Sequence, residues 1–333
     1  MVCKVASFVR QAMKAVCIHK FGGPEVLQLE TTPVPAPGDD EVLIRIHAAG
    51  INPVDTYIRA GSHVLTPPLP AVLGFDVAGV VQQVGDSVTK FKEGDRVFGG
   101  LSKCGGYAEY AVSNVKKLYP LSENLSFSQG AALHTPYFTA YRALVTKCCP
   151  KEGETVLVHG ASGGVGMAAV QIAKSLGLTV VGTAGSTEGM ELVKKLGADH
   201  VFNHREKGYL NNAVAAVNCR GFDVVIENLA NVNLGADFTV LNHNGRIAVV
   251  GSRGTVEVNP RSLMITEGSV HGVMLSQSTE EEEEEAGKVL MYGIEDGWVK
   301  PVIAREYTLE QAAQAHLDII ENPGATGKLV FTV

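Results

Sequence analysis

The 333-residue chain has a single tryptophan, no cysteines spaced as C-x-x-C and no long apolar run. A helix needs about 20 mostly apolar residues to cross a bilayer, so the sequence predicts no membrane span. The six cysteines are scattered, and no secretory signal is recognisable. This usage indicates reduced thiols and a cytoplasmic protein.

Basic residues are outnumbered, because 28 Lys and Arg face 35 Asp and Glu, for a formal net charge of −7. An acidic surface repels phosphate backbones, so nucleic acid is not the expected main partner, although a local RNA-binding patch stays open. Residues 1–24 carry no acid, as in mitochondrial presequences, but contain only one serine. We therefore favour a short N-terminal extension, residues 1–12, over mitochondrial import.

Short strands separated by Gly, Pro and Asp turns are typical of the first part of the chain. Glu41–Ala48 (EVLIRIHA) alternates clearly. Further strands are predicted at Asp76–Val84, Gly94–Phe98 and Gly105–Val112, separated by Gly and Asp turns. Strands that recur about every 8 to 12 residues predict a partly closed antiparallel β-barrel.

From about Ser126, strands alternate with helical stretches, which predicts a parallel sheet with crossover helices. The predicted strands are Thr155–His159, Thr179–Thr183, His200–Asn203, Phe222–Glu227, Arg246–Gly251 and Val270–Leu275. Six strands in this arrangement form a doubly wound Rossmann fold. The run Glu280–Glu285 follows Ser278 and Thr279, so it predicts a capped helix start rather than an acidic tail.

The string Val156–Gly166 (VLVHGASGGVG) joins an apolar strand to an amphipathic helix through a glycine-rich turn. This geometry places a pyrophosphate on a helix N-terminus. Gly163 lets the backbone approach the phosphates, and Gly166 lets the helix pack on the sheet. The sequence therefore predicts dinucleotide binding.

The second strand of this fold ends as Val181–Ser186 (VGTAGS), without the Asp or Glu that holds the ribose 2′-hydroxyl of NAD. An uncharged turn leaves room for a 2′-phosphate, so the sequence favours NADPH. We expect the phosphate to contact Ser186 and the backbone of Gly185, with His204 and Arg205 arriving from the third strand.

No metal site is predicted. Zinc requires three or four converging Cys, His or carboxylate ligands. Cys104 stands alone between Cys17 and Cys148, and the histidines show no paired ligand motif.

Longer strings extend this interpretation along the chain. They are Phe21–Leu27 (FGGPEVL), Gly50–Tyr57 (GINPVDTY), Pro136–Arg142 (PYFTAYR), Phe202–Glu206 (FNHRE), Ala230–Asn233 (ANVN), Val250–Gly254 (VGSRG) and Gly324–Lys328 (GATGK). From Met13 to Val333 the chain resembles the zinc-free medium-chain dehydrogenases/reductases, and among them the quinone oxidoreductases of the zeta-crystallin type. The resemblance implies an α/β protein with a GroES-like barrel as catalytic domain, residues 13–128 completed by 277–333, and a Rossmann domain at 129–276.

The resemblance also implies site residues. Tyr57 and Asn52 would act as catalytic residues over the nicotinamide. The implied cofactor contacts are Tyr57, Ser162, Gly163, Gly164, Val165, Gly185, His204, Asn233, Val250, Gly251, Ser252, Arg253, Val273, Met274 and Leu275. In zinc-containing members, cysteines stand at or near Asn52 and Thr135 and a His-Glu pair at Phe75–Asp76, so the resemblance implies no zinc here.

The implied activity is NADPH-dependent reduction of quinones, ortho-quinones above all, by hydride or electron transfer. Reduction of α,β-unsaturated carbonyls and a crystallin or AU-rich-RNA-binding role are the alternatives. Two departures, the polar His134–Thr135 and the glutamate run, leave the substrate range and the oligomer contacts open.

A strand at 270–275 would be the open edge of the sheet, where unpaired backbone groups invite another strand. Pairing with the same strand of a second copy predicts a two-fold dimer, and the resemblance implies tetramers of such dimers.

Overall fold

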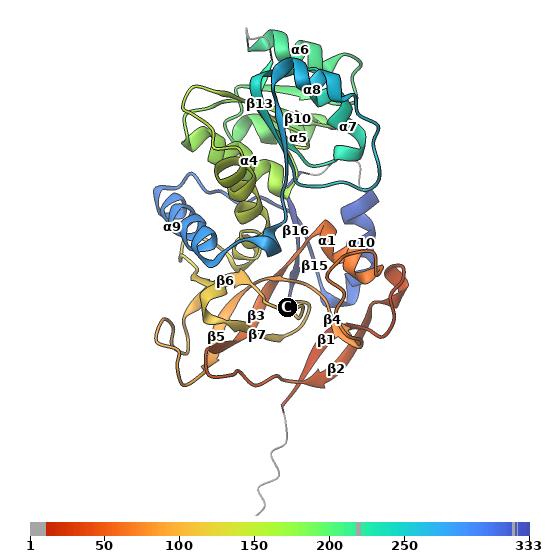
Figure 1. The fold of residues 1–333 in the computed structure, drawn as a ribbon. Helices are drawn as coiled ribbons and strands as arrows, with labels where there is room; N and C mark the ends of the chain where they lie inside the picture. The colour runs from red at the N-terminus through yellow and green to blue at the C-terminus, as the bar shows by residue number, and fades with distance from the viewer. Residues whose placement is uncertain (1–10, 218–220, 322–323, 325) are drawn as a thin grey trace, which may run out of the picture. The chain divides into compact units, whose positions relative to one another are not determined.

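The computed structural model describes residues 11–217, 221–321, 324 and 326–333 (Figure 1). These residues form two units. The first comprises the described part of Met1–Ala131 with Glu306–Ile320 and Leu329–Val333, and the second comprises that of Ala132–Arg305 with Glu321–Lys328. Most of the expected N-terminal extension, residues 1–10, lies outside the described residues. So does Asn322, where the sequence predicts the end of a C-terminal helix that begins at Thr308.

The first unit is β-rich, as the sequence predicts. One sheet has the order β15-β16-β3-β5-β6-β8, with β7 also paired to β3, and a second has the order β2-β1-β4. The long strand β3 pairs with three others, and register shifts at Leu43/Ile44 and Ile46/Ala48 let it bend. The strands are β1 (Ala12–Ile18), β2 (Gln28–Pro33), β3 (Glu41–Ile51), β4 (Ala71–Val72), β5 (Asp76–Val84), β6 (Arg96–Gly100), β7 (Tyr110–Asn114), β8 (Leu118–Pro120), β15 (Ile303–Tyr307) and β16 (Lys328–Thr332).

Short helices connect these strands. They are η1 (Pro24–Val26), α1 (Pro53–Arg59), η2 (Val115–Lys117), α2 (Phe127–Gly130), η6 (Leu309–Gln311) and α10 (Ala312–Glu321). Sequence reasoning missed α1, although Pro53 at its first position directly follows Asn52 as N-cap. A proline at the first helical position costs no hydrogen bond and its φ suits a helix, so Asn-Pro was the available signal.

The second unit contains a parallel sheet of six strands with the order β11-β10-β9-β12-β13-β14. This order is the doubly wound Rossmann arrangement, so the predicted fold class is confirmed. Its central strand β9 is buried along its whole length, as expected of a strand covered on both faces. The strands are β9 (Thr155–Val158), β10 (Thr179–Ala184), β11 (His200–Asn203), β12 (Phe222–Glu227), β13 (Leu241–Val249) and β14 (Ser269–Gly272).

The helices of this unit follow the predicted alternation with two differences. Two π-helical segments, η3 and η4, flank α3, and α8, which begins at a second Asn-Pro pair, was not predicted. The helices are η3 (His134–Phe138), α3 (Thr139–Tyr141), η4 (Arg142–Lys147), α4 (Gly164–Ser175), α5 (Thr187–Lys195), α6 (Tyr209–Ala216), α7 (Ala230–Asp237), α8 (Pro260–Thr266), η5 (Leu275–Gln277) and α9 (Glu280–Asp296).

The edge strand was predicted as Val270–Leu275, and this is wrong at both ends. Pairing with β13 runs from Arg246–Ser269 to Val249–Gly272 and stops where β13 itself ends. The predicted cofactor residues at 273–275 therefore follow the strand instead of forming its end.

The glutamate run begins a helix, as predicted. Thr279 Oγ1 accepts a hydrogen bond from Glu282 N at 3.2 Å, and Glu282 Oε2 accepts one from Thr279 N at 3.0 Å. This capping box satisfies two backbone donors at the start of α9. Glu282 also forms an ion pair with Arg142. The helix α9 lies in the second unit, whereas the resemblance implies a catalytic domain completed by residues 277–333.

Among the described helices, none has the length and apolar composition that a bilayer span requires.

Candidate functional site

The predicted cofactor residues of the second unit lie on segments that follow its strands. Ser162–Val165 follow β9, Gly185 and Ser186 follow β10, His204 follows β11, Asn233 lies in α7 after β12, Val250–Arg253 follow β13, and Val273–Leu275 follow β14. Since all six strands are parallel, their carboxyl ends share one edge of the sheet. Ligands of doubly wound folds bind at this edge.

The turn after β9 is built by glycine. Gly160 has a φ of +59°, in the left-handed region that side chains rarely adopt. A Cβ on Gly166 would lie 2.3 Å from the carbonyl oxygen of Gly160, so only glycine lets α4 pack this closely against the turn. Gly163 is the N-cap of α4, and a phosphate commonly binds at a helix end of this kind, where backbone N–H groups point outward.

The turn after β10 is enclosed by two basic side chains. A Cβ on Gly185 would lie 2.8 Å from His204 Nε2 and 3.0 Å from Arg205 Nε. The space that glycine leaves is thus bordered by two nitrogen-bearing groups. No acid stands in the turn itself, which consists of Ala184, Gly185 and Ser186.

Ser186 has a structural role at the same place. Its Oγ accepts a hydrogen bond from Gly189 N at 3.1 Å and caps α5. A hydroxyl that accepts in this way can still donate its own hydrogen, so Ser186 can cap the helix and bind an anion together.

Burial lowers the pKa of His204, and the charges of Arg205 and His159 lower it further. His204 is therefore neutral near pH 7 in the cofactor-free protein. An adjacent phosphate dianion would favour its charged form.

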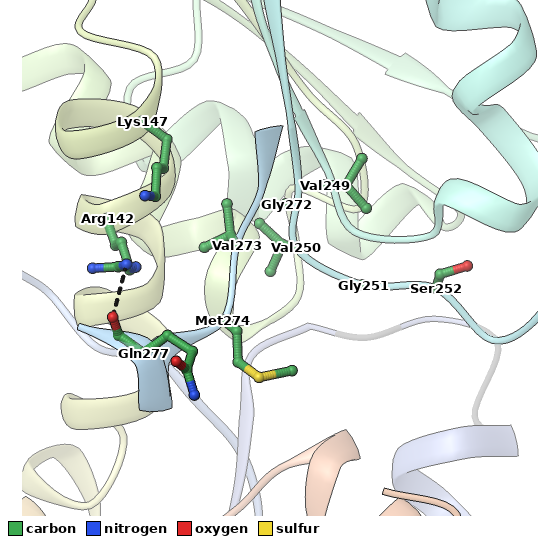
Figure 2. A pocket seen from close by; sticks show the side chains of 10 residues that line it. All are labelled: Arg142, Lys147, Val249, Val250, Gly251, Ser252, Gly272, Val273, Met274 and Gln277. Atoms are coloured by element: carbon green, nitrogen blue, oxygen red, sulfur yellow. Dashed lines mark hydrogen bonds between the residues drawn. The ribbon is translucent and has the colours of Figure 1, made fainter. Parts of the chain in front are cut away.

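A pocket of about 430 Å³ opens beside the ends of β13 and β14 (Figure 2). Five predicted residues line it, namely Val250, Gly251, Ser252, Val273 and Met274. Arg142 and Lys147 line the opposite side from η4, and Arg142 Nη2 donates to the carbonyl oxygen of Gln277 at 3.1 Å. Sequence reasoning assigned neither cation to the site, although Arg142 ends the string PYFTAYR.

In the first unit, Asn52 and Tyr57 belong to the same short element, since Asn52 caps α1 and Tyr57 lies within it. Asn52 is 3% exposed, and its Nδ2 donates to Asp76 Oδ2 at 2.9 Å. Its backbone N–H donates to Asp55 Oδ2 at 2.8 Å. Asp76 therefore orients the amide and occupies one of its two N–H groups, while Tyr57 is half-buried.

The second unit also contains a buried cluster that sequence reasoning missed. His159 follows β9, Glu227 ends β12 and Asp237 ends α7, and each residue is at most 2% exposed. His159 Nε2 lies 2.9 Å from Asp237 Oδ1 and 3.6 Å from Glu227 Oε2. Only the sheet topology brings them together, because 78 residues separate His159 from Asp237.

Comparisons with known proteins bear on both units. The model of the alcohol dehydrogenase GroES-like domain matches residues 38–123, and that of the zinc-binding dehydrogenase matches residues 164–290. Human quinone oxidoreductase is 53% identical over 323 residues, which cover 97% of this chain and 98% of that protein. The chain belongs to the quinone oxidoreductases of the medium-chain dehydrogenase/reductase family.

Solved structures agree with this family. The Escherichia coli quinone oxidoreductase complexed with NADPH has a TM-score of 0.87 at 32% identity, covering 96% of this chain and 100% of that one. A structure titled as an NAD-dependent alcohol dehydrogenase has a TM-score of 0.89 at 32% identity with the same coverage. Because both share this backbone, the fold does not select the dinucleotide, and the side chains of the site must.

Zinc, which one family model carries in its name, does not fit the residues of this quinone oxidoreductase. Of the positions that correspond to zinc ligands, Asn52 and Thr135 offer no usual ligand atom. Asp76 does, but its Oδ2 accepts the Asn52 amide. We therefore derive no step through zinc.

Proposed function

We propose that this member of the quinone oxidoreductases uses NADPH to reduce quinones, with ortho-quinones as the favoured class. The turn after β10 carries the proposal, because it lacks an acid and places His204 and Arg205 around the glycine at 185. Two basic side chains suit a 2′-phosphate, whereas a free 2′-hydroxyl would be held by a carboxylate.

Each group of residues has a distinct proposed role. The N-terminus of α4, with Ser162–Val165, holds the pyrophosphate. Gly185, Ser186 and His204 hold the 2′-phosphate, and Asn233, Val250–Arg253 and Val273–Leu275 hold the nicotinamide half. When bound, the reduced nicotinamide supplies the hydride, and the protein orients it and excludes water.

A quinone is already electrophilic, so hydrogen-bond donors can replace a Lewis acid at its oxygen. We assign this role to the Tyr57 hydroxyl and to the Asn52 amide. Asp76 supports the assignment of Asn52, because it fixes which way the amide points.

A panel of cofactors and substrates tests the proposed function. NADPH and NADH are each combined with 9,10-phenanthrenequinone, a para-quinone and an enone, and initial rates are measured. We expect the highest kcat/KM with NADPH and the ortho-quinone. A higher value with the enone would assign the chain to the reductases of α,β-unsaturated carbonyls.

We also propose a homodimer, able to pair further into a tetramer. The support is β14, which pairs with β13 and lies at the edge of the sheet. Val270 on this strand is 38% exposed and Met274, just after it, is 40% exposed. An open edge strand is protected when a second copy pairs with it. Light scattering at micromolar concentration should give a dimer or a tetramer, and a monomer would contradict the proposal.

A cytoplasmic location is the remaining proposal. It is supported by the described cysteines, since Cys17, Cys104, Cys148 and Cys149 are all free thiols. Such thiols are typical of a reducing compartment. Cell fractionation tests this, and recovery in mitochondria would overturn it.

A further inference from the structure

The cluster of His159, Glu227 and Asp237 combines complete burial with two negative side chains. The single Nε2–H of His159 points to Asp237 at 2.9 Å. Glu227 Oε2 and Asp237 Oδ2 are buried without a hydrogen-bond partner in this geometry. A buried carboxylate oxygen without a donor is costly, so two of them side by side call for a positive charge or a proton.

The three groups lie close enough for a cation to be considered, since their ligand atoms are within 4.8 Å of one another. However, the nitrogen of His159 that would face a cation is engaged in the hydrogen bond to Asp237. One additional proton would compensate the buried carboxylate oxygens without displacing the hydrogen bond between His159 and Asp237. With a charged His159 and one protonated carboxyl, the cluster is neutral, whereas two ionised carboxylates leave a buried net charge of −1.

Glu227 connects this cluster to the proposed cofactor segment. Its Oε1 accepts hydrogen bonds from the backbone N–H of Leu229 and, at 3.3 Å, from Nδ2 of Asn233. Asn228 Nδ2 donates to the carbonyl oxygen of His159 at 2.8 Å. These hydrogen bonds connect the segment from 228 to 233 to the buried cluster.

The same segment is held to the loop after β13. The N–H of Ala230 donates to the carbonyl oxygen of Gly251 at 2.8 Å, and Arg253 N donates to Asn231 Oδ1 at 2.8 Å. Gly251 and Arg253 are both candidates for contact with the nicotinamide half. A charge on Glu227 is thus one or two hydrogen bonds away from the candidate cofactor residues.

We propose that Glu227 is a positioning residue that holds a proton in common with Asp237, and that binding of the anionic dinucleotide draws a proton onto this cluster. The proposal rests on NADPH binding as proposed above. Glu227 need not touch the cofactor, because it acts through Leu229 and Asn233 and through its charge. The substrate's own chemistry is not involved.

The surrounding groups agree with a shared proton. Burial raises the pKa of Glu227 to about 7, and the Asp237 charge adds to this against the opposing charge of His159. Asp237 and Glu227 raise the pKa of His159 although its burial opposes that. Tyr209 from α6 stacks edge-on against His159 and stays protonated, and His204 after β11 is a further titratable group that interacts with His159.

Calorimetry measures the proton directly. NADPH is titrated into the cofactor-free wild type near pH 7 in buffers with different heats of ionisation, and the same is done with Glu227→Gln. We expect the wild type to take up a fraction of a proton, and Glu227→Gln to lose that fraction. Glu191→Gln, an exposed substitution on α5, is the matched control and should behave as the wild type.

The pH dependence of affinity gives a second readout. The Kd for NADPH should rise between pH about 6 and pH about 8, and the increase in the wild type should be about five times as large as the increase in Glu227→Gln. A factor of about five is at the lower end of the coupling usually found between two sites. His204→Ala should keep the Glu227-dependent part of the proton uptake, which separates the cluster from any proton taken up at the 2′-phosphate. Asp237→Asn serves as the second variant should Glu227→Gln not fold.

The outcomes are distinguishable. Absence of any NADPH binding by the wild type would contradict the proposed function, whereas binding with equal proton uptake in wild type and Glu227→Gln would overturn this inference alone. A large thermal stabilisation by Zn²⁺ in the wild type, lost in Glu227→Gln, would also overturn it and assign the cluster to a cation. Infrared difference spectra should show a protonated carboxyl in the wild type at neutral pH that is missing in Glu227→Gln.

Discussion

The two units each bury a histidine, and the neighbours of these histidines favour a neutral ring in the first unit and a charged ring in the second. In the first unit, His316 is 1% exposed, its Nδ1 lies 3.1 Å from Arg59 Nη1 and its Nε2 lies 3.2 Å from the Tyr107 hydroxyl oxygen. In the second unit, His159 is 2% exposed and lies between two carboxylates. Equal burial thus accompanies different neighbours.

Hydrogen-bond donors determine the state of His316. Arginine can only donate, so Nδ1 of His316 must accept. The Tyr107 hydroxyl donates its one hydrogen to Asp55 Oδ2 at 2.8 Å, so Nε2 of His316 must donate to the tyrosine oxygen. The ring is therefore neutral, and burial with the Arg59 charge lowers its pKa to about 3. A buried histidine is charged only where carboxylates outweigh the loss of solvation, as they do at His159.

The largest effect should come from removing the histidine that is charged. His159→Leu leaves two carboxylates buried without their cation, and breaking a buried ion pair from one side costs about 3–5 kcal/mol. His316→Leu removes a neutral partner and should cost about 1–3 kcal/mol. Denaturant unfolding at pH 7, with hydrogen exchange to follow each unit, measures both. Equal losses would mean that charge does not distinguish the two sites.

A change of pH should shift the stabilities of the two units in opposite directions. The pKa of His316 is about 3 in the folded protein and about 6.5 when unfolded, so the unfolded state binds more protons between these values, and stability falls as pH drops. At pH about 5 the first unit should have lost about 2 kcal/mol relative to pH 7, at about 1.4 kcal/mol per pKa unit. His316→Gln should show a flatter dependence.

The second unit should respond in the opposite direction. The pKa values of Glu227 and His159 are raised on folding, so the folded state holds more protons, and the stability of the cofactor-free unit falls as pH rises towards and past 7. Hydrogen exchange at several pH values reports each unit separately. The same sign in both units would contradict the assigned charge states.

Cofactor preference should depend on the second unit. Ser186→Asp keeps the cap of α5, because Asp and Ser are similar N-caps, but places a carboxylate beside the expected 2′-phosphate. We expect a loss of about 1–3 kcal/mol in NADPH binding, or roughly 5- to 150-fold, with NADH binding unchanged or improved.

Ser186→Asn is the matched control for this change, since it caps the helix without a charge. His204→Ala should weaken NADPH more than NADH, increasingly so as pH falls and the imidazole becomes charged. Equal losses for both cofactors in the Asp and Ala variants would show that these residues shape the turn and do not read the phosphate.

The smallest effect belongs to the first unit. Tyr57→Phe removes one proposed hydrogen bond to the quinone oxygen and should lower kcat about 10-fold, or about 1.4 kcal/mol. The Kd for NADPH should stay within twofold of the wild-type value, a change of at most about 0.4 kcal/mol. Stopped-flow reduction of 9,10-phenanthrenequinone measures this. Tyr110→Phe, at another half-buried tyrosine on β7, is the control. An unchanged kcat in Tyr57→Phe would remove Tyr57 from the proposed chemistry.

Local sequence was sufficient wherever one segment encodes its own structure. The alternation of strands and helices predicted the doubly wound order, and the glycine-rich string predicted the turn at which Gly160 has a positive φ. The Asn-Pro pairs at Asn52 and Asn259 were not recognised as helix starts, although in both cases the asparagine caps a helix that begins at the proline. That error was avoidable from sequence, because the proline needs no N–H at the first helical position.

The length of β14 depended on its neighbour. Residues 270–275 (VHGVML) were predicted as one strand, but a strand requires a partner, and β13 provides one only as far as Val249. The role of Ser186 as cap of α5 and the proximity of His204 to Gly185 likewise depend on where β10 and β11 end.

The sequence by itself determined the fold class, the dinucleotide turn and the absence of an acid after the second strand, because each of these is written in residues adjacent along the chain. Only the tertiary structure decided the charge of the buried histidines. His159 meets Asp237 78 residues away, and Arg59 meets His316 across 257 residues. A pKa depends on the charges and the water that surround a group in space, and composition and spacing do not specify those until the chain is folded.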